Sequence, residues 1–497
     1  MAIKPLHCAA VDLGATSGRV IVGTWAKGRL TLKEVHRFPN ALRSANGYEY
    51  WDILRLWAEV QTGLRAAVAT LPRGAKLASV GVDTWGVDYV LTNDAGRIVF
   101  PTHAYRDART QPGLAHLTNT RAALDRIYAA TGIPAMFYNS SLQLAETIES
   151  CPAITDLATR CLFLPDYFNF LLSGKMANGL SIASTTQLLD VHSNDWSRVA
   201  LDYFRVPPVW LSPPVATGTK LGKVLPEVGR ILRMSRGSSG RLALPGANPL
   251  ENTQVIAVPG HDTTCAYDAM PAAADGADIF LSCGTWSLVG FESATPLLGP
   301  AALTGRVAND RTGRGEYRPL VNVIGLWMLE ETLKDFASRP KNDTGWAKLI
   351  KAASHLAPHP SPLEMIFAEF GHPPSMKAAI DAQLKRRKLP RPKNLAGYVR
   401  LICDSLGAGH ALAIRDFEQL SGRTFKRILM VGGGSKNRLL CQATADASGL
   451  PVHSFALEGT AVGNLANQLI ALKAVKNLAS FRASLAADLK QTIYQPH

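Results

Sequence analysis

The sequence predicts an α/β fold made of two domains. Its 497 residues exceed what one hydrophobic core usually supports, so two domains are expected. The first half alternates short apolar segments with longer amphipathic ones, which is typical of helices packed on a mixed sheet. Each half also contains a strand, a turn of small residues and a second strand. A stretch rich in Gly, Pro, Ser and Arg over residues 221–254 is loop-like, so we expect domains 1–258 and 259–497.

The elements of the first half follow from the spacing of apolar residues and from the glycines between them. In chain order, the pattern predicts strands over residues 9–13, 20–23 and 30–36, a helix over 51–70, strands over 78–83 and 87–91, and helical segments near 124–131, 142–149 and 166–172.

The first turn, between the strands 9–13 and 20–23, has the composition of an anion site. Its small residues Ala15 and Gly18 allow backbone N–H groups to approach an anion, and Thr16, Ser17 and Arg19 add donors. Asp12, at the end of the preceding strand, is suited to a hydrated Mg²⁺. The stretch is neither a Walker loop nor a dinucleotide fingerprint, because Gly-Lys-Ser/Thr and Gly-x-Gly-x-x-Gly are both missing. It indicates a polyphosphate cradle, with an ordinary tight turn as the alternative.

The second half repeats this strand–turn–strand pattern. Residues 278–291 form a strand, a small turn with the hydroxyl of Thr285 at its tip, and another strand. A third strand, 427–431, ends in Gly432-Gly433-Gly434 and turns into a helix, for which Ser435 is the expected N-cap. Three glycines leave room for a flat group against the backbone, or simply make a tight strand-to-helix turn. Two such hairpins and a glycine-rich corner are the parts of an actin-like (ribonuclease H-like) ATPase, in which a nucleotide lies between two duplicated domains.

A candidate general base lies at the start of the second domain. Pro259-Gly260-His261-Asp262-Thr263-Thr264 precedes a short apolar pattern, so Asp262 is expected at a helix N-terminus, where the helix dipole keeps a carboxylate ionised. Such a carboxylate can accept the proton of an attacking hydroxyl during phosphoryl transfer. The alternative is an N-cap aspartate. His261 and Thr263 are candidates to hydrogen-bond a polyol, or else are core or capping residues.

Charge and cysteine usage exclude several classes of protein. The formal net charge is +14, but the basic residues are dispersed except for a cluster over residues 385–393, which is either a solvated linker or a phosphate patch. We expect no nucleic-acid partner.

The seven cysteines form no Cys-x-x-Cys pair and predict neither a disulfide framework nor a zinc site. No apolar run is long enough to span a bilayer and the start does not resemble a signal peptide, so we expect no membrane partner and a cytoplasmic location.

Beyond these features, a series of short motifs runs along the chain. The motifs are Val11-Asp12-Leu13-Gly14-Ala15-Thr16-Ser17-Gly18-Arg19, Asp83-Thr84-Trp85-Gly86-Val87-Asp88, Tyr105-Arg106-Asp107-Ala108-Arg109, Leu164-Pro165-Asp166-Tyr167-Phe168, Ala183-Ser184-Thr185-Thr186-Gln187, Gly260-His261-Asp262-Thr263, Ser282-Cys283-Gly284-Thr285-Trp286-Ser287-Leu288, Gly325-Leu326-Trp327, Val431-Gly432-Gly433-Gly434 and Gly463-Asn464. Each motif is weak, but together and in this order they resemble the FGGY family of carbohydrate kinases from about residue 8 to 470. The resemblance implies a nucleotide and sugar cleft between the two domains.

The resemblance implies a role for each matched residue. The implied nucleotide contacts are the phosphate loop Ala15, Thr16, Ser17, Gly18 and Arg19, the second loop with Thr285, and Gly433 at the adenosine. The implied sugar contacts are Gly86, His261, Asp262, Thr263 and Asn322, with Asp262 as general base and Asp12 holding Mg²⁺ through water. Trp85 is either a wall of the sugar pocket or a core aromatic. Asp88 is a sugar ligand or a turn carboxylate, and we favour the ligand.

The implied reaction is ATP-dependent transfer of a phosphoryl group to the primary hydroxyl of a ketose, with Mg²⁺. L-rhamnulose, giving its 1-phosphate, ranks first; L-fuculose or D-xylulose are alternatives, and a non-catalytic nucleotide-binding regulator ranks lower. A monomer or homodimer is expected. The chain departs from the family in three ways. Glu330 replaces a glutamine that contacts the nucleotide, residues 229–249 are longer and more basic, and the family's paired cysteines are not evident.

Overall fold

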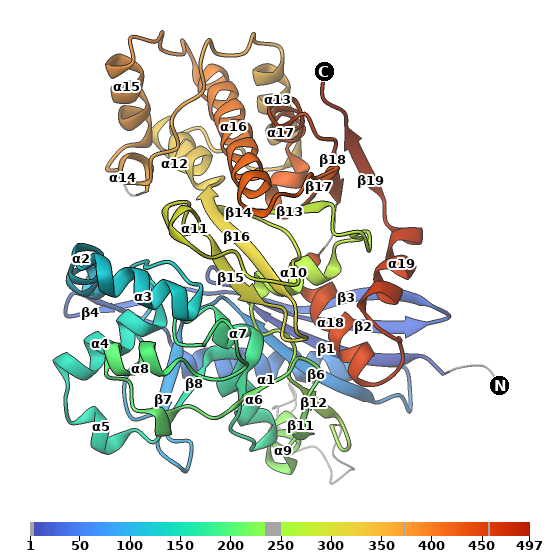
Figure 1. Cartoon of the computed structure of the whole chain (residues 1–497). Coiled ribbons are helices and arrows are strands. Elements are labelled where there is room, and N and C mark those ends of the chain that lie inside the picture. The colour runs from blue at the N-terminus through green and yellow to red at the C-terminus, as the bar shows by residue number, and fades with distance from the viewer. Residues whose placement is uncertain (1–3, 234–249, 372, 456–457) are drawn as a thin grey trace. The chain divides into compact units, whose positions relative to one another are not determined.

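A computed structural model describes residues 4–233, 250–371, 373–455 and 458–497 (Figure 1). The chain divides into two compact units, each described by itself below. Unit 1 comprises Met1–Ala269, Ser293–Arg318 and Gly459–Asp488, and unit 2 comprises Met270–Glu292, Pro319–Glu458 and Leu489–His497. Within the described ranges, no helix is both long and apolar enough to cross a membrane.

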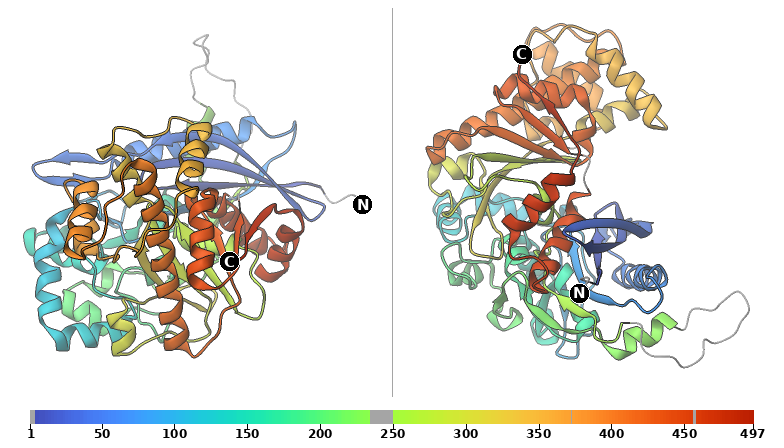
Figure 2. Two further views of the ribbon diagram at one scale, coloured as in Figure 1. Left: turned by 90° about the horizontal axis from the view of Figure 1, so that it is seen from above. Right: turned by 90° about the vertical axis from the view of Figure 1, so that its right-hand side faces the viewer.

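Unit 1 is built on a six-stranded mixed sheet in the order β11-β12-β6-β1-β2-β3. The central strand β1 pairs antiparallel with β2 and parallel with β6, and nearly all of its side chains are buried, as expected for a strand covered on both faces. The edge strand β3 is largely exposed. Figure 2 shows β1, β2 and β3, in blue, lying side by side. The strands are β1 (Leu6–Leu13), β2 (Ser17–Ala26), β3 (Arg29–Pro39), β6 (Leu77–Thr84), β11 (Lys220–Lys223) and β12 (Gln254–Ile256).

Helices cover this sheet, and two of them approach each other closely. A Cβ on Gly463 of α18 would lie 1.7 Å from the carbonyl oxygen of Cys265 on α10, so only glycine permits this contact. The helices of unit 1 are α1 (Ile53–Ala69), α2 (Gln111–Asn119), α3 (Arg121–Thr131), α4 (Ser140–Ser150), α5 (Ile154–Leu157), α6 (Leu164–Ser173), α7 (Leu180–Ser184), α8 (Arg198–Phe204), α9 (Pro226–Arg233), α10 (Asp262–Ala269), α11 (Pro300–Thr304), α18 (Gly459–Ala471) and α19 (Leu478–Asp488), with short 3₁₀ turns η1 (Ala108–Thr110) and η2 (Pro208–Trp210). Its minor strands are β4 (Arg43–Ala45), β5 (Tyr48–Tyr50), β7 (Tyr89–Thr92), β8 (Arg160–Phe163), β9 (Asn178–Gly179), β10 (Pro214–Val215) and β15 (Ala308–Arg311).

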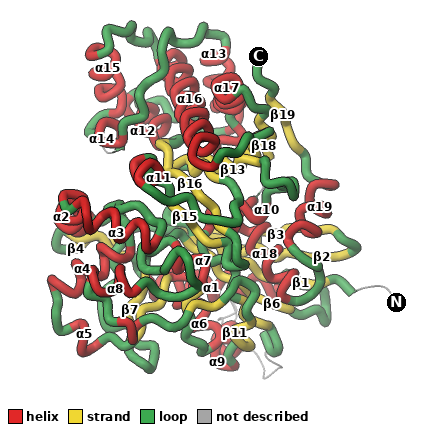
Figure 3. Tube along the Cα trace, viewed as in Figure 1, coloured by secondary structure: helices red, strands yellow, loops and turns green. Residues whose placement is uncertain are grey.

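Unit 2 contains strands in the order β16-β14-β13-β17-β18-β19, of which the first two residues of β16 are counted with unit 1. The hairpin of β13 and β14 is antiparallel, and β13 pairs parallel with β17. The strands are β13 (Asp278–Cys283), β14 (Trp286–Gly290), β16 (Tyr317–Ile324), β17 (Arg427–Val431), β18 (Val452–Phe455) and β19 (Gln491–Tyr494). The helices are α12 (Trp327–Asp335), α13 (Asp343–Ser354), α14 (Phe367–Phe370), α15 (Met376–Arg386), α16 (Leu395–Ser421) and α17 (Arg438–Ser448), with the 3₁₀ turn η3 (Gly433–Lys436). Figure 3 shows that both units mix helices and strands.

The predicted elements of the first half are present with small shifts of their ends, and both predicted hairpins form. One strand starts later than predicted: β7 begins at Tyr89, because residues 86–88 form a turn. The predicted N-cap Ser435 is wrong. Ser435 lies inside η3, and the cap of α17 is Asn437, whose Oδ1 accepts the N–H groups of Leu439 and Leu440. Of the basic segment 229–249, residues 234–249 lie outside the described part of the chain.

Candidate functional site

Two aspartates meet at the ends of neighbouring strands in unit 1. Asp12 on β1 and Asp83 on β6 are register partners, and both are buried. On the other side, Arg19 of β2 is the register partner of Asp12, and its Nε and Nη2 lie 2.8 and 2.7 Å from Asp12 Oδ2. Asn464 of α18 donates to Asp83 Oδ2, whereas Asp83 Oδ1 is buried with no hydrogen-bond partner among the described residues. Asp83 is not among the predicted site residues, although it ends a strand of the same type as the one that carries Asp12.

The charge balance at this pair suits a cation. Burial, and next the neighbouring charge of Asp12, raise the pKa of Asp83 well above its usual value, against the opposing hydrogen bond from Asn464. The described residues include no group of three or more His, Cys, Asp or Glu side chains placed to hold a metal directly. Mg²⁺ usually keeps several waters and binds one or two carboxylates together with substrate phosphates. The unpartnered Asp83 Oδ1 beside a second carboxylate therefore fits a hydrated Mg²⁺ held by Asp12 and Asp83.

The turn that follows β1 has a fixed shape. Gly14 N donates to Ser17 O at 3.0 Å, and a Cβ on Gly14 would lie 2.8 Å from that same oxygen, so the turn requires glycine. Asn40 holds the turn from outside, since its N donates to Thr16 O and its Nδ2 to Gly14 O. A Cβ on Gly18 would lie 2.2 Å from the ring of Phe38. The predicted phosphate loop is thus an ordered turn, in which the Arg19 guanidinium is engaged by Asp12.

The candidate base Asp262 is the first residue of α10, as predicted. Its Oδ1 accepts Thr263 N at 2.6 Å and Thr263 Oγ1 at 3.2 Å, and its Oδ2 has no hydrogen-bond partner among the described residues. The side chain is one-third exposed. Thr84 N donates to Gly260 O at 2.9 Å, which fixes this segment to the end of β6. Asp262 is therefore near Asp83, whose pKa its charge helps to raise.

His261 lies between two carboxylates. Its Nε2 is 3.4 Å from Asp262 Oδ1 and its Nδ1 is 3.4 Å from Asp310 Oδ2. Burial lowers the pKa of His261, but the carboxylates of Asp310 and Asp262 outweigh burial and raise it above its usual value. A Cβ on Gly86 would lie 3.3 Å from His261 Nε2, so Gly86 and His261 are neighbours. Asp310 is not among the predicted site residues.

Trp85 and Asp88, the other predicted sugar contacts of unit 1, are buried. Trp85 Nε1 donates to Asp88 Oδ2 at 2.8 Å, and the Trp85 ring packs against Trp51 with centroids 4.2 Å apart. These contacts favour a core or positioning role over direct sugar binding for Asp88.

The remaining predicted residues, Thr285, Asn322 and Gly433, lie in unit 2. Thr285 is in the turn between β13 and β14, and its carbonyl accepts Trp327 N at 3.1 Å. Gly433 follows Gly432, whose φ is +86° and whose Cβ would lie 2.6 Å from Cys283 O. Asn322 is on β16 opposite Leu288 and is exposed. The glycine-rich corner therefore packs its backbone directly on the end of β13.

Two further sequence features have partners in unit 2. Glu330, the departure from the family's glutamine, accepts Arg339 Nε at 2.8 Å, so its charge is partly compensated. In the basic cluster, Arg386 pairs with Glu369 at 2.8 Å, and Arg387 Nη1 donates to the carbonyl of Pro362 at 2.6 Å. These contacts engage Arg386 and Arg387 within the protein and argue against a phosphate patch at these two residues.

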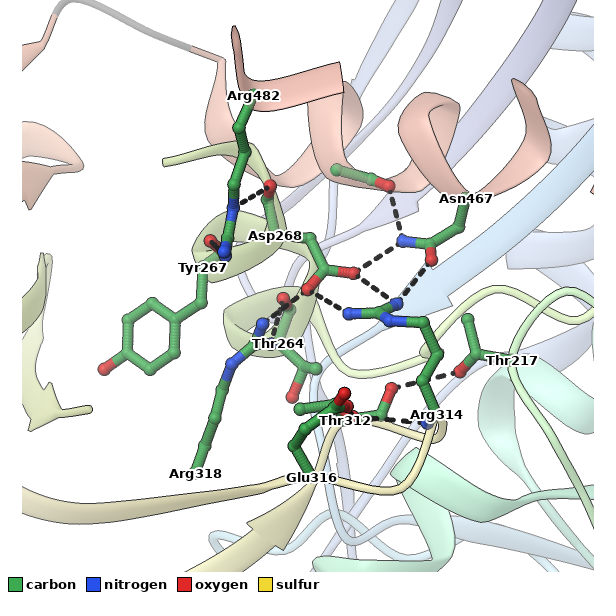
Figure 4. A network of polar contacts seen from close by, with 11 residues as sticks. Thr217, Thr264, Tyr267, Asp268, Thr312, Arg314, Glu316, Arg318, Asn467 and Arg482 are labelled. Carbon is green, nitrogen blue, oxygen red and sulfur yellow. Dashed lines mark hydrogen bonds and ion pairs between the residues drawn. The ribbon is translucent and has the colours of Figure 1, made fainter. Parts of the chain in front are cut away.

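The last residues of α10 belong to a buried charge network in unit 1 (Figure 4). Asp268 Oδ1 accepts Arg318 Nη2 at 2.5 Å and Arg314 Nη2 at 2.8 Å, while Oδ2 accepts Arg314 Nη1 at 3.0 Å and Asn467 Nδ2 at 2.6 Å. Arg482 of α19 donates to the carbonyl of Tyr267 at 2.9 Å. The helix that begins at Asp262 is thus tied at its other end to β16, α18 and α19.

Comparison with known proteins identifies the family. Residues 8–234 match the N-terminal domain, and residues 279–472 the C-terminal domain, of the FGGY family of carbohydrate kinases. Rhamnulokinases of Klebsiella pneumoniae subsp. pneumoniae and of Enterobacter sp. strain 638 are each 35% identical over 99% of this chain, covering 95% and 94% of their own lengths. The two matched domains and their order along the chain define an ATP-dependent sugar phosphotransferase. The chain belongs to the FGGY family of carbohydrate kinases, and its cofactors are ATP and Mg²⁺.

Solved structures confirm the two-domain actin-like fold. Xylulose kinase from Rhodospirillum rubrum matches with a TM-score of 0.77 at 19% identity, covering 99% of this chain and 94% of its own. Plasmodium falciparum glycerol kinase with ADP matches with a TM-score of 0.78 at 13% identity and the same coverage. At these identities the likeness concerns the fold alone.

Proposed function

We propose that this carbohydrate kinase transfers the γ-phosphoryl group of ATP to O1 of L-rhamnulose. We infer the class of sugar from the similarity to rhamnulokinases over almost the whole chain. The observation that carries the chemistry is Asp262 at the N-terminus of α10, with Oδ2 unpartnered among the described residues and close to Asp83. We further propose a cytoplasmic monomer or homodimer with domains 1–258 and 259–497.

Asp262 accepts the proton in this proposal. As O1 of the ketose bonds to the γ-phosphorus, the bond from that phosphorus to the leaving oxygen of ADP breaks, and the O1 proton passes to Asp262 Oδ2. His261, which lies beside Asp310, donates a hydrogen bond to a sugar hydroxyl. Gly86, Thr263 and Asn322 are the other proposed sugar contacts.

The proposed nucleotide residues provide donors for the phosphates. The turn of Ala15, Thr16, Ser17 and Gly18 offers backbone N–H groups and hydroxyls, Thr285 offers another hydroxyl, and Gly433 leaves room for the adenosine. Asp12 and Asp83 hold Mg²⁺ through its water. Bound there, Mg²⁺ would neutralise charge on the phosphate oxygens.

The test is ADP release with Mg-ATP and a panel of L-rhamnulose, L-fuculose, D-xylulose, D-ribulose and glycerol. We expect a selective response to L-rhamnulose. A selective response to another ketose would overturn the proposed substrate while leaving the family intact. If the protein binds ATP but releases ADP with none of these sugars, the proposal that it phosphorylates a ketose is wrong.

Asp83→Asn is expected to stabilise the metal-free protein and weaken its response to Mg²⁺. Because the folded pKa of Asp83 is raised, its ionised form destabilises the fold at pH above the ordinary carboxyl pKa. Each unit by which a carboxyl pKa is raised in the folded state corresponds to about 1.4 kcal/mol of destabilisation by the ionised form. Asparagine keeps an oxygen for Asn464 and offers an N–H₂ group toward Asp12.

Urea unfolding without metal, near neutral pH, measures the first effect, and Mg²⁺ titration of ATP binding measures the second. In wild type the destabilising effect shrinks as the pH falls through the raised pKa and is gone below the ordinary carboxyl pKa, so the difference between the two proteins should decrease in acid. A variant that is less stable than wild type at neutral pH, or that needs no more Mg²⁺ for half-maximal ATP binding, would contradict the assignment.

A further inference from the structure

The turn between β6 and β7 has an unusual backbone. Val87 has a φ of +68°, a region that β-branched residues rarely occupy. Asp88 N donates to Gly86 O at 2.9 Å, closing a three-residue turn around Val87. With positive φ at its centre this is the rare and strained form of the γ-turn. Such strain persists only where surrounding structure imposes it, and it clusters at functional sites.

Buried side chains of α4 impose this conformation. Ser140 Oγ donates to the carbonyl oxygen of Val87 at 2.5 Å, and Gln143 Nε2 lies 3.4 Å from that oxygen. The carbonyl of Asp88 accepts Leu164 N at 3.1 Å. Both carbonyls of the strained segment are therefore held by hydrogen bonds.

The Asp88 carboxylate is the centre of the arrangement. It is 1% exposed. Its Oδ2 accepts Trp51 Nε1 at 2.6 Å, Trp85 Nε1 at 2.8 Å and Tyr105 N at 3.2 Å, and its Oδ1 accepts Gln143 Nε2 at 3.1 Å. Four donors from four parts of the chain converge on one carboxylate, so it has little capacity for a sugar hydroxyl. It is suited instead to fixing the two indole rings and the turn.

The other end of the turn faces the proposed sugar contacts. A Cβ on Gly86 would meet His261 Nε2 at 3.3 Å and Thr185 Oγ1 at 3.5 Å. A movement of Val87 or Asp88 shifts Gly86 relative to His261, because Gly86 and Asp88 are joined by the hydrogen bond of the turn.

We propose that Asp88 is a positioning residue, which holds the strained turn at Val87 and so places Gly86 and Trp85 for binding of the ketose without touching it. This inference rests on the proposed function, since it takes Gly86 and His261 as sugar contacts. It replaces the direct ligand role predicted for Asp88.

The ionisation of Asp88 gives the arrangement a pH dependence. Burial raises the pKa of Asp88 to about 6, although the hydrogen bonds from Trp85, Gln143, Trp51 and Tyr105 each lower it. The ionised carboxylate therefore holds the four donors most strongly above about pH 6, and protonation weakens these hydrogen bonds as the pH falls through that value. Arg109 Nη2 donates to Gln143 Oε1 at 3.1 Å. The ionisable side chains on the surrounding elements include Tyr105, Arg106, Asp107, Arg109, Glu146 and Asp166.

The first test separates sugar affinity from turnover. For Asp88→Asn we expect the KM for L-rhamnulose to rise about tenfold, the size of effect of losing a hydrogen bond to a charged group. The KM for ATP and kcat should stay within about twofold, since those steps use other residues. In wild type the sugar KM should rise below about pH 6, and this rise should be absent in the variant. Asp166→Asn, which alters another buried carboxylate of unit 1, is the matched control and should leave the sugar KM unchanged.

The second test does not depend on activity. The protein has nine tryptophans, and the indole N–H signals of Trp51 and Trp85 can be assigned in NMR spectra from Trp51→Phe and Trp85→Phe. Both signals should titrate together near pH 6 in wild type and not in Asp88→Asn. Absence of this joint titration, or an unchanged sugar KM in Asp88→Asn, would overturn the inference. Failure of wild type to phosphorylate any ketose would instead overturn the proposed function, and the NMR titration would still decide whether Asp88 holds the indoles.

Discussion

Asp262→Asn is expected to lower kcat by at least about a hundredfold, the contribution of a positioned general base. The reason is local. Asparagine retains an oxygen for the N–H and hydroxyl of Thr263, which both bond Oδ1 in the wild type, so α10 should start at the same residue. It cannot accept the proton of the attacking hydroxyl. Binding of ATP, measured by calorimetry, should stay within about twofold, because the phosphate turn and its partners are unchanged.

The matched control is Asp343→Asn. Asp343 is also the first residue of a helix, α13 in unit 2, so this change removes a carboxylate from the same kind of helix terminus. Its kcat should equal that of wild type. Near-normal turnover of Asp262→Asn would show that the proton goes elsewhere, and a loss of ATP binding would point to a structural role for Asp262.

Features set by neighbouring residues could be predicted from the sequence. The two hairpins with their small turns, α1, and Asp262 at the start of α10 each follow from apolar spacing, glycine and a helix-start pattern within about ten residues. The wrong N-cap shows the limit of this reasoning. Ser435 and Asn437 are both good capping residues, and only the path of the chain through η3 decides between them.

Features set by pairing between distant segments could not be predicted. The role of Asp83 depends on the register of β6 against β1, and its partner Asn464 comes from α18, hundreds of residues later. The return of Gly459–Asp488 to unit 1 depends likewise on the close packing of α18 on α10 at Gly463. The resemblance to the family supplied Asp88 as a candidate, but not the four donors that surround its carboxylate.

Asp268→Asn is expected to have the largest effect on stability. Arg318 is fully buried, and its Nη2 donates to Asp268 Oδ1. Burial alone would raise the pKa of Asp268, but the charges of Arg314 and Arg318 outweigh it and hold the pKa well below its usual value. Removing one partner of a buried ion pair costs about 3–5 kcal/mol, because the other charge stays buried and uncompensated. Urea unfolding should show a loss of this size, or the variant should fail to accumulate as folded protein.

Arg314→Gln provides a graded variant in case Asp268→Asn does not fold, because Arg314 is partly exposed and its loss leaves Asp268 paired with Arg318. It should be destabilised by less than Asp268→Asn. Asp125→Asn is the control, since its ion pair with Arg121 is exposed and such pairs contribute ~0–1 kcal/mol. Equal stabilities of Asp268→Asn and Asp125→Asn would contradict the role of the network.

The pH dependence of this loss identifies its cause. A carboxylate whose folded pKa is depressed contributes stability above its unfolded pKa, near 4, and loses it only as the pH falls through the folded value. The difference between wild type and Asp268→Asn should therefore be constant from about pH 8 to pH 5 and shrink only in strong acid. Because α10 carries Asp262 at one end and Asp268 at the other, a folded Asp268→Asn protein should also show reduced kcat. A stability loss that varies across the neutral range would instead indicate that a histidine or a carboxylate of raised pKa, rather than Asp268, carries the effect.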